Sequence, residues 1–289
     1  MDPSQFGPFV LVVLMTVVGM DLTLADFRRV LAAPRAVVGG TLAQLLLLPL
    51  MTWGVVTSLD LAPVFGAGAV LVAVSPGAGI SNIMVALAGA NVALSVSLTA
   101  FASVLAVVTL PTLSALFIGV FLDDAAHLSV PVVPLVRQLA LSLLLPILFG
   151  MWVRQRWPGF AMRNVGRLQR YALLGILLVV VVAVALGDEQ PDVGFADARG
   201  ALLGGGLWTL CALAIGMGMG TLLRLPERDR TTFAIEFAAR NIAVTAIVAL
   251  SGLGRLDLTL FAGAYTAVGY PMCFAFAFWR SRRHRKADG

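Results

Sequence analysis

The sequence predicts an all-α polytopic membrane protein with about nine transmembrane helices. Of its 289 residues, 60% are hydrophobic and only 12% are charged, whereas a soluble domain carries about a quarter charged residues. Apolar stretches near spanning length lie at 6–24, 37–57, 63–88, 92–120, 131–153, 170–187, 200–223, 231–252 and 258–279. Because these stretches occupy nearly the whole chain, we treat residues 1–289 as a single transmembrane domain without a soluble catalytic part.

The charged residues predict which side of the membrane each loop faces. Placing the basic tail of residues 280–289 in the cytoplasm fixes every other loop by alternation, because short basic loops face the cytoplasm. Most of the 20 lysines and arginines then lie inside, and the outside loops are mainly acidic. We expect an outside N-terminus and a cytoplasmic C-terminus in a bacterial inner membrane. The lipid bilayer, and no nucleic acid, is the expected partner of the basic residues.

The sequence carries no catalytic motif, and its cysteines do not indicate a metal site. Cys211 and Cys273 lie inside apolar segments, at a spacing that matches neither a metal site nor a disulfide framework. The two histidines, His127 and His284, lie in predicted loops. Strings typical of zinc proteases and serine hydrolases do not occur. We therefore expect no enzyme activity.

Two of the predicted spans are interrupted near their middle. In the third, the string 75–82 combines a proline, which lacks an N–H, with glycines that tolerate non-helical angles. Backbone groups freed at membrane depth are tolerated only inside protein or beside water. In the eighth, Glu236 and Arg240 place opposite charges at mid-span, where each costs about 2.5–3.5 kcal/mol. Such residues are typical of a functional site.

The positions of the interruptions indicate an internal repeat. Helices 1–4 start from the outside and helices 6–9 from the inside, with helix 5 as connector, and the third helix of each set is the broken one. Paired breaks in halves of opposite topology are typical of transporters with a binding site at the membrane midplane.

Each feature also has a structural explanation when it is taken alone. A Pro-Gly string can be a simple kink, and Glu236 and Arg240, four residues apart, can form a structural ion pair. The hydroxyls of Ser81, Ser95 and Thr99 can bond to carbonyls of their own helices. The joint occurrence of all these features favours the transporter interpretation.

The same strings resemble the bile acid:sodium symporter family, also called the SBF-like or BASS transporters. The matching stretches are 19–23, 26–27, 43–44, 76–84, 89–95 and 236–241. The resemblance implies a core domain with two crossing discontinuous helices and a panel domain that moves against it. It also implies sodium-driven transport of an organic anion, such as a bile-acid-like molecule or a small carboxylate. The family's common plan has ten helices, and this chain matches a nine-helix variant.

The resemblance further implies two sodium sites behind the crossing. The first matches, by motif position, Ser81, Asn82, Ser95, Thr99 and Glu236. Their hydroxyl, amide and carboxylate oxygens are the ligands that suit a hard cation such as Na⁺. Gly79, Asn82, Arg240 and Asn241 are the residues that we expect to face the substrate.

The second implied site departs from the family pattern. It matches Gln44, Glu236 and nearby backbone carbonyls, but Arg240 stands where a glutamine ligand is expected. A guanidinium has donors and no acceptor, so it cannot ligate sodium. One hypothesis is that Arg240 fills this site as a fixed charge paired to Glu236 and Gln44, which would reduce coupling to one sodium or remove it. The other is that Arg240 binds a carboxylate of the substrate.

Three functions therefore remain open. The first is a sodium-coupled transporter of an organic anion with reduced sodium stoichiometry. The second is a sodium-independent anion exchanger or exporter that uses Arg240 as a permanent cation. The third, a membrane anion sensor, is disfavoured because the spans leave no room for a signalling domain.

Overall fold

The computed structural model describes residues 6–25, 28, 33–119, 121, 132–168, 171 and 194–288. Within these ranges every regular element is a helix. Five of the described helical stretches are long and apolar enough to cross a membrane: Pro34–Ser58, Val92–Ile118, Val132–Arg156, Ala196–Leu222 and Asp257–His284. The prediction of an all-α membrane protein is confirmed for this part of the chain. The predicted span 170–187 lies outside it, apart from residue 171.

Most of the long helices run through without a break. They are α3 (Pro34–Ser58), α6 (Val92–Ile118), α10 (Phe195–Leu222) and α13 (Leu260–Asp288), the last preceded by the 3₁₀ turn η4 (Asp257–Thr259). The helix α7 (Val132–Leu139) continues through the π-helical turn η2 (Ala140–Leu144) into α8 (Leu145–Arg156). Pro49, Pro111 and Pro271 lie inside α3, α6 and α13 without ending them. A proline alone therefore does not determine where this chain breaks a helix.

Two helices end partway and resume after an unwound segment, as the sequence predicts. The first is α4 (Pro63–Val74), which resumes as α5 (Gly79–Leu87). The second is α11 (Glu227–Ala238), which resumes as α12 (Ile242–Ile247) and continues into η3 (Val248–Gly252). Glu236 remains inside α11, and Arg240 lies in the unwound segment.

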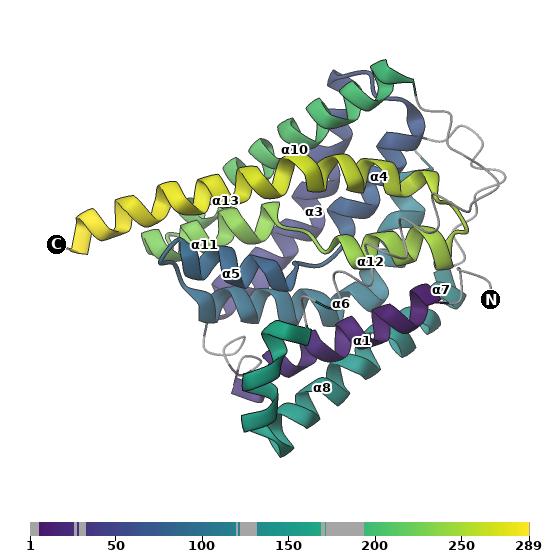
Figure 1. Cartoon of the computed structure of the whole chain (residues 1–289). Coiled ribbons are helices and arrows are strands. Elements are labelled where there is room, and N and C mark those ends of the chain that lie inside the picture. Colours follow the sequence, from purple (N-terminus) through teal and green to yellow (C-terminus); the bar gives the residue numbers. More distant parts are fainter. Residues whose placement is uncertain are drawn as a thin grey trace.

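The helices pack around two clusters of buried apolar side chains. One cluster joins α3, α10, α11 and α13, and the other joins α1 (Phe6–Asp21), α6, α8 and α12. Figure 1 shows α10 and α13 along one side of the molecule and α1 with α8 along the opposite side. The helix α4 contributes to both clusters. The broken helices therefore lie where the two clusters meet.

Two glycines bring α1 and α8 together backbone to backbone. A Cβ atom on Gly19 would lie 2.2 Å from the carbonyl oxygen of Ile147, and one on Gly150 would lie 2.0 Å from that of Thr16. Small residues permit such approaches between membrane helices, whose association depends on close packing. The two helices therefore form one tightly packed pair.

This packing predicts that Gly150→Ala destabilises the protein by about 1–3 kcal/mol, because the added methyl group forces α8 away from α1. Thermal unfolding of the purified protein in detergent measures the effect. Gly218→Ala, in α10, is the matched control, since a Cβ atom there meets nothing within 4 Å. It should leave the melting temperature unchanged or raise it slightly. Equal melting temperatures of Gly150→Ala and the wild type would contradict the close packing of α1 against α8.

Candidate functional site at the helix crossing

The two unwound segments lie side by side and satisfy each other's backbone groups. The N–H of Asn241 donates to the carbonyl oxygen of Pro76 at 2.9 Å, and the N–H of Ala78 donates to that of Ala239 at 3.2 Å. Together they form a short antiparallel bridge. Figure 1 shows α5 and α11 on one side of this junction and α4 and α12 on the other. The two broken helices thus meet at their breaks, and each supplies partners that the other lacks.

The carboxylate of Glu236 lies at this crossing among three hydroxyl groups. Ser81 and Ser95 bond to its Oε1 atom, and Thr99 Oγ1 donates to Oε2 at 2.9 Å. Ser95 Oγ also lies 2.8 Å from Asn82 Oδ1. The side chains of Glu236, Ser81 and Ser95 are fully buried. The structure therefore brings together all five residues that the family resemblance assigns to the first sodium site.

Helical spacing and one glycine set this arrangement. Ser95 and Thr99 are four residues apart on α6, so they face the same side of that helix. A Cβ atom on Gly77 would lie 2.7 Å from Glu236 Oε2 and 3.0 Å from Thr99 Oγ1. Only a residue without a side chain leaves room for the carboxylate at this place.

The oxygen atoms of this cluster have the chemistry of a hard-cation site. A carboxylate, an amide carbonyl and three hydroxyls supply oxygen ligands, which suit alkali and alkaline-earth ions better than soft metals. Each hydroxyl can donate to the carboxylate or rotate to offer a lone pair to a cation. Among the described residues, no group of three or more His, Cys, Asp or Glu side chains could hold a transition metal. The residues present fit sodium.

The guanidinium of Arg240 is buried at the same crossing, where it donates to oxygen atoms of the protein. Its Nη1 atom lies 2.7 Å from Gln44 Oε1. Its Nη2 atom donates to the carbonyl oxygens of Ser75 and, at 3.3 Å, Ala73. Both carbonyls lie at the C-terminal end of α4, where the helix dipole favours a positive charge. Arg240 therefore acts as a cap for the first broken helix.

The structure does not support a side-chain ion pair between Glu236 and Arg240. Nη1 of Arg240 lies 3.4 Å from the backbone carbonyl oxygen of Glu236, and the carboxylate bonds instead to hydroxyls. The physical reason is that α11 ends at Ala238, so the helical spacing that would pair the two side chains no longer holds. Gln44 does pair with the guanidinium, as one hypothesis requires.

Comparison with known proteins identifies the family. The model of the sodium bile acid symporter family matches residues 8–190, more than half of the chain. The chain belongs to this family. Its members are transporters rather than enzymes, which confirms the expectation that this sodium bile acid symporter homologue is not an enzyme.

Relatives from plants, bacteria and animals align over most of the chain. "Probable sodium/metabolite cotransporter BASS2, chloroplastic" of Oryza sativa subsp. japonica is 28% identical over 237 residues, covering 82% of this chain and 54% of that protein. "Uncharacterized sodium-dependent transporter YocS" of Bacillus subtilis (strain 168) is 26% identical over 299 residues, covering 99% and 86%. "Sodium/bile acid cotransporter 4" of Homo sapiens is 27% identical over 252 residues, covering 82% and 54%. The chain spans about half the length of the rice and human proteins.

The four residues expected to face the substrate of this symporter homologue differ in accessibility. Gly79, the first residue of α5, and Asn82 keep partly exposed surface. Asn241 is buried, and its Oδ1 atom accepts the N–H of Val244 at the start of α12. Arg240 is 1% exposed, with its donors turned toward protein oxygens. In this conformation Gly79 and Asn82 are the two of the four that keep partly exposed surface.

Sequence reasoning missed two tyrosines of α13 at the crossing. The hydroxyl of Tyr265 bonds to the backbone of Ala238 and Arg240, and that of Tyr270 bonds to the carbonyl oxygen of Arg240. Their residue type could have drawn attention to them, because the sequence has only one other tyrosine, Tyr171, in a predicted span. Nothing in their spacing, however, links them to a break in another helix.

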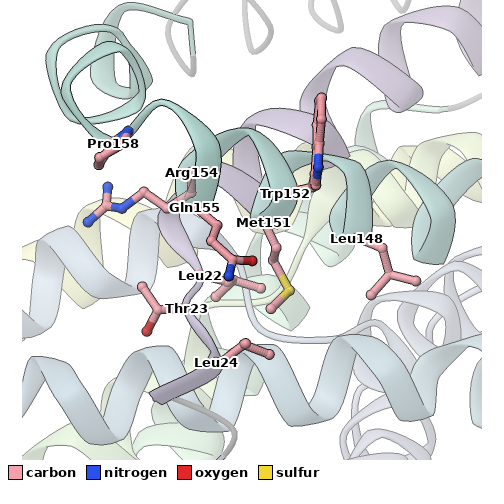
Figure 2. Close-up of a pocket in the computed structure, with 9 residues that line it drawn as sticks. All are labelled: Leu22, Thr23, Leu24, Leu148, Met151, Trp152, Arg154, Gln155 and Pro158. Atoms are coloured by element: carbon pink, nitrogen blue, oxygen red, sulfur yellow. The ribbon is translucent and has the colours of Figure 1, made fainter.

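A separate cavity of about 520 Å³ lies beside the end of α1 and along α8 (Figure 2). Its lining residues are Leu22, Thr23, Leu24, Leu148, Met151, Trp152, Arg154, Gln155 and Pro158. None of the residues predicted to hold the ion or the substrate lines this cavity. We therefore place the candidate site at the crossing and not in the cavity.

The crowding at Gly77 predicts that Gly77→Ala displaces the Glu236 carboxylate. We expect the free energy of unfolding to fall by about 1–3 kcal/mol, with a lower melting temperature of the purified protein. Gly54→Ala is the control, because a Cβ atom at Gly54 in α3 has open space around it. Thermal unfolding of the two variants side by side makes the comparison. A melting temperature of Gly77→Ala equal to that of Gly54→Ala would show that the carboxylate does not lie against this glycine.

Proposed function

We propose that this protein is a secondary active transporter that moves an organic anion across the membrane by alternating access, driven by a sodium gradient. The observation that carries the proposal is the oxygen cluster around Glu236, buried where two broken helices meet. A buried carboxylate surrounded by neutral oxygens suits a small monovalent cation, which would neutralise it. The names of the rice, Bacillus and human relatives, each of which mentions sodium, support the same driving ion.

Asn82 offers a physical link between the ion and the substrate. Its Oδ1 atom bonds to Ser95, whose hydroxyl also bonds to Glu236, while part of the residue stays exposed. It lies in the first turn of α5, whose N-terminal end carries partial positive charge that favours an anion. Sodium held by the cluster would fix Asn82 and this helix end together. In this proposal an anion binds well only after the ion has bound.

We propose further that one sodium is transported in each cycle. The guanidinium of Arg240 donates to Gln44 Oε1 and to carbonyls at the end of α4, oxygens that could otherwise ligate a second cation. A fixed positive charge within hydrogen-bond distance of these oxygens repels a sodium ion from them. Arg240 would thus replace the second ion permanently.

A sodium-independent anion exchanger is the alternative that one observation favours. The Nε atom of Arg240 is buried without a hydrogen-bond partner among the described residues. A guanidinium with a donor to spare could hold a substrate carboxylate after a small rearrangement. In that case Arg240 would supply the positive charge that sodium supplies in the leading proposal.

The described packing suggests which parts would move. The helices α1 and α8 pack on each other, and α1 approaches the crossing helices through α12 and η3. The half-helix α5 packs instead against α6 and α13, and α11 packs mainly against α10. We propose that α1 and α8 belong to a panel that rocks against a core built on the crossing. The N-terminus would lie outside, and the basic C-terminus would lie in the cytoplasm of a bacterial cell.

The sodium site predicts that Thr99→Val raises the sodium concentration for half-maximal uptake about tenfold, because one oxygen of the cluster is lost. Sodium titration of anion uptake into proteoliposomes measures this value. Thr112→Val is the matched control, since Thr112 lies on the same helix with its hydroxyl bonded to the carbonyl oxygen of Val108. Uptake that does not depend on sodium in the wild type would refute the leading proposal and favour the exchanger.

The fixed-charge hypothesis predicts that Arg240→Gln steepens the sodium dependence, from a Hill coefficient of about one toward about two. Glutamine supplies an oxygen ligand and removes the charge that repels the second ion. Arg240→Lys keeps the charge and should keep the shallow dependence. A wild-type coefficient near two, or equal slopes for the wild type and Arg240→Gln, would contradict the hypothesis.

A further inference from the structure

The backbone of the second break has partners from outside its own helix. In a continuous helix the N–H of Arg240 would donate to the carbonyl oxygen of Glu236. Here it donates to the hydroxyl of Tyr265 at 3.0 Å. The carbonyl oxygens of Ala238 and Arg240 accept hydrogen bonds from Tyr265 and Tyr270, the latter at 2.7 Å. Two phenols of α13 therefore satisfy three backbone groups that the unwound segment leaves free.

The first break supplies the remaining partners, but it cannot replace the tyrosines. The bridge between the two breaks uses the N–H of Asn241 and the carbonyl oxygen of Ala239. It leaves the N–H of Arg240 and the carbonyl oxygens of Ala238 and Arg240 without a partner from that side. These groups are buried, so they cannot form hydrogen bonds with bulk water. The phenols thus complete the hydrogen bonding of the second break.

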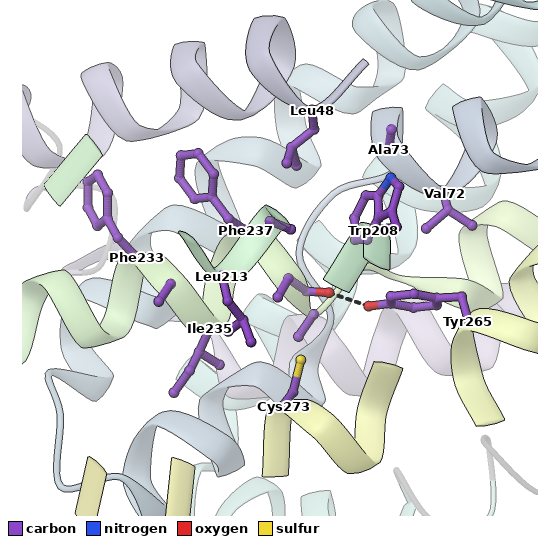
Figure 3. Close-up of a cluster of buried hydrophobic side chains, with 14 of the residues drawn as sticks. Leu48, Val72, Ala73, Trp208, Leu213, Phe233, Ile235, Phe237, Tyr265 and Cys273 are labelled. Atoms are coloured by element: carbon purple, nitrogen blue, oxygen red, sulfur yellow. Dashed lines mark hydrogen bonds between the residues drawn. The ribbon is translucent and has the colours of Figure 1, made fainter. Parts of the chain in front are cut away.

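Tyr265 is held rigidly in a position to do this. It is fully buried, and its ring packs edge-on against Trp208 and Tyr270, with centroids 5.3 and 5.5 Å away. Figure 3 shows the ring beside Trp208, with the hydroxyl hydrogen-bonded to a backbone carbonyl. Trp208 is itself fixed by a 2.8 Å bond from Nε1 to Thr52 Oγ1 on α3. Three helices therefore position one hydroxyl.

Two glycines make room for the ring. A Cβ atom on Gly205 of α10 would lie 3.0 Å from the Cα atom of Tyr265. One on Gly269, four residues along α13, would lie 2.9 Å from the Tyr265 ring. The close approach of α10 and α13 at this level depends on residues without side chains. The packing thus leaves the phenol little freedom to move away from the break.

From this geometry we propose that Tyr265 and Tyr270 are positioning residues for the ion site. They hold the segment from Ala238 to Arg240 unwound, and the unwound path sets where the Glu236 carboxylate and the Arg240 guanidinium lie. Without the Tyr265 hydroxyl, the N–H of Arg240 would gain by returning to the carbonyl oxygen of Glu236. That rewinding would move both charged residues. The role rests on the proposed sodium site for its functional consequence, but its structural consequence is independent of sodium.

The structural consequence is tested by hydrogen–deuterium exchange of peptides that cover 238–242, in detergent without sodium. Tyr265→Phe keeps the ring and removes the hydroxyl. We expect the exchange rate of this segment to differ about tenfold from that of the wild type. Tyr270→Phe should produce a smaller change in the same peptides, since one bond is lost instead of two. Tyr171→Phe is the matched control, because the third tyrosine of the chain is exposed. Exchange equal to that of the control in both variants would overturn the proposal.

The functional consequence is tested by sodium titration of thermal stability and of anion uptake. Tyr265→Phe should raise the half-saturating sodium concentration about tenfold, with a much smaller effect on the rate at saturating sodium. A merely structural role would lower the amount of folded protein and the maximal rate without moving half-saturation. If Tyr265→Phe does not fold, the same titration of Tyr270→Phe decides, and an unchanged value overturns the proposal. A wild type without any sodium response would instead refute the sodium site. The hydrogen–deuterium exchange result would still test whether the two tyrosines hold the segment unwound.

Discussion

The need to satisfy backbone hydrogen bonds away from water is the constraint on which this structure depends. A membrane helix that unwinds exposes N–H and carbonyl groups that lipid cannot satisfy. This chain unwinds two helices at the same place. Ala78 of the first break donates to the carbonyl oxygen of Ala239 in the second, and Asn241 of the second donates to that of Pro76 in the first. A single broken helix would leave these groups unpaired. The pairing therefore explains why both breaks occur together and why they lie side by side.

The same crossing holds two opposite charges without joining them directly. Hydroxyls surround the carboxylate of Glu236, while carbonyl and amide oxygens surround the guanidinium of Arg240. Each charged group thus has hydrogen-bond partners suited to its sign, which offsets part of the cost of its burial. The carboxylate is not paired with the guanidinium, and its oxygens bond to hydroxyls that can rotate to let a cation bind. Under the proposed function, this separation lets the site take up and release its ion.

Much of this arrangement could be predicted from the sequence, and the reasons differ between elements. The apolar stretches and the strings around Pro76 and Glu236 predict the spans and the breaks, because membrane depth makes prolines, glycines and charges conspicuous. The partners of Arg240 could not be predicted in full. The spacing of four residues suggests a pair with Glu236, and only the unwound backbone shows that the guanidinium turns to Ser75 instead.

The tyrosines of α13 illustrate the limit more sharply. A hydroxyl that completes a break belongs to a helix that is itself unbroken, so no local pattern in α13 marks it. Its role follows from its packing against Trp208 and from its hydrogen bonds to backbone groups of another helix. In any broken membrane helix, each freed N–H and carbonyl group needs a hydrogen-bond partner from elsewhere. Partners that come from unbroken neighbours are then candidates for residues that set the geometry of the site.

The position of Arg240 also bears on how a cycle with one ion could work. In a site filled by an ion, departure of the ion leaves the carbonyl oxygens at the end of α4 facing one another without a cation between them. The guanidinium is covalently attached, so these oxygens keep their partner whether or not the Glu236 cluster is occupied. Under the proposed function, only the cluster on α5, α6 and α11 would then change its charge during transport. The crossing would keep its shape in the ion-free state, and the energy of a single sodium would be coupled to the movement of the anion.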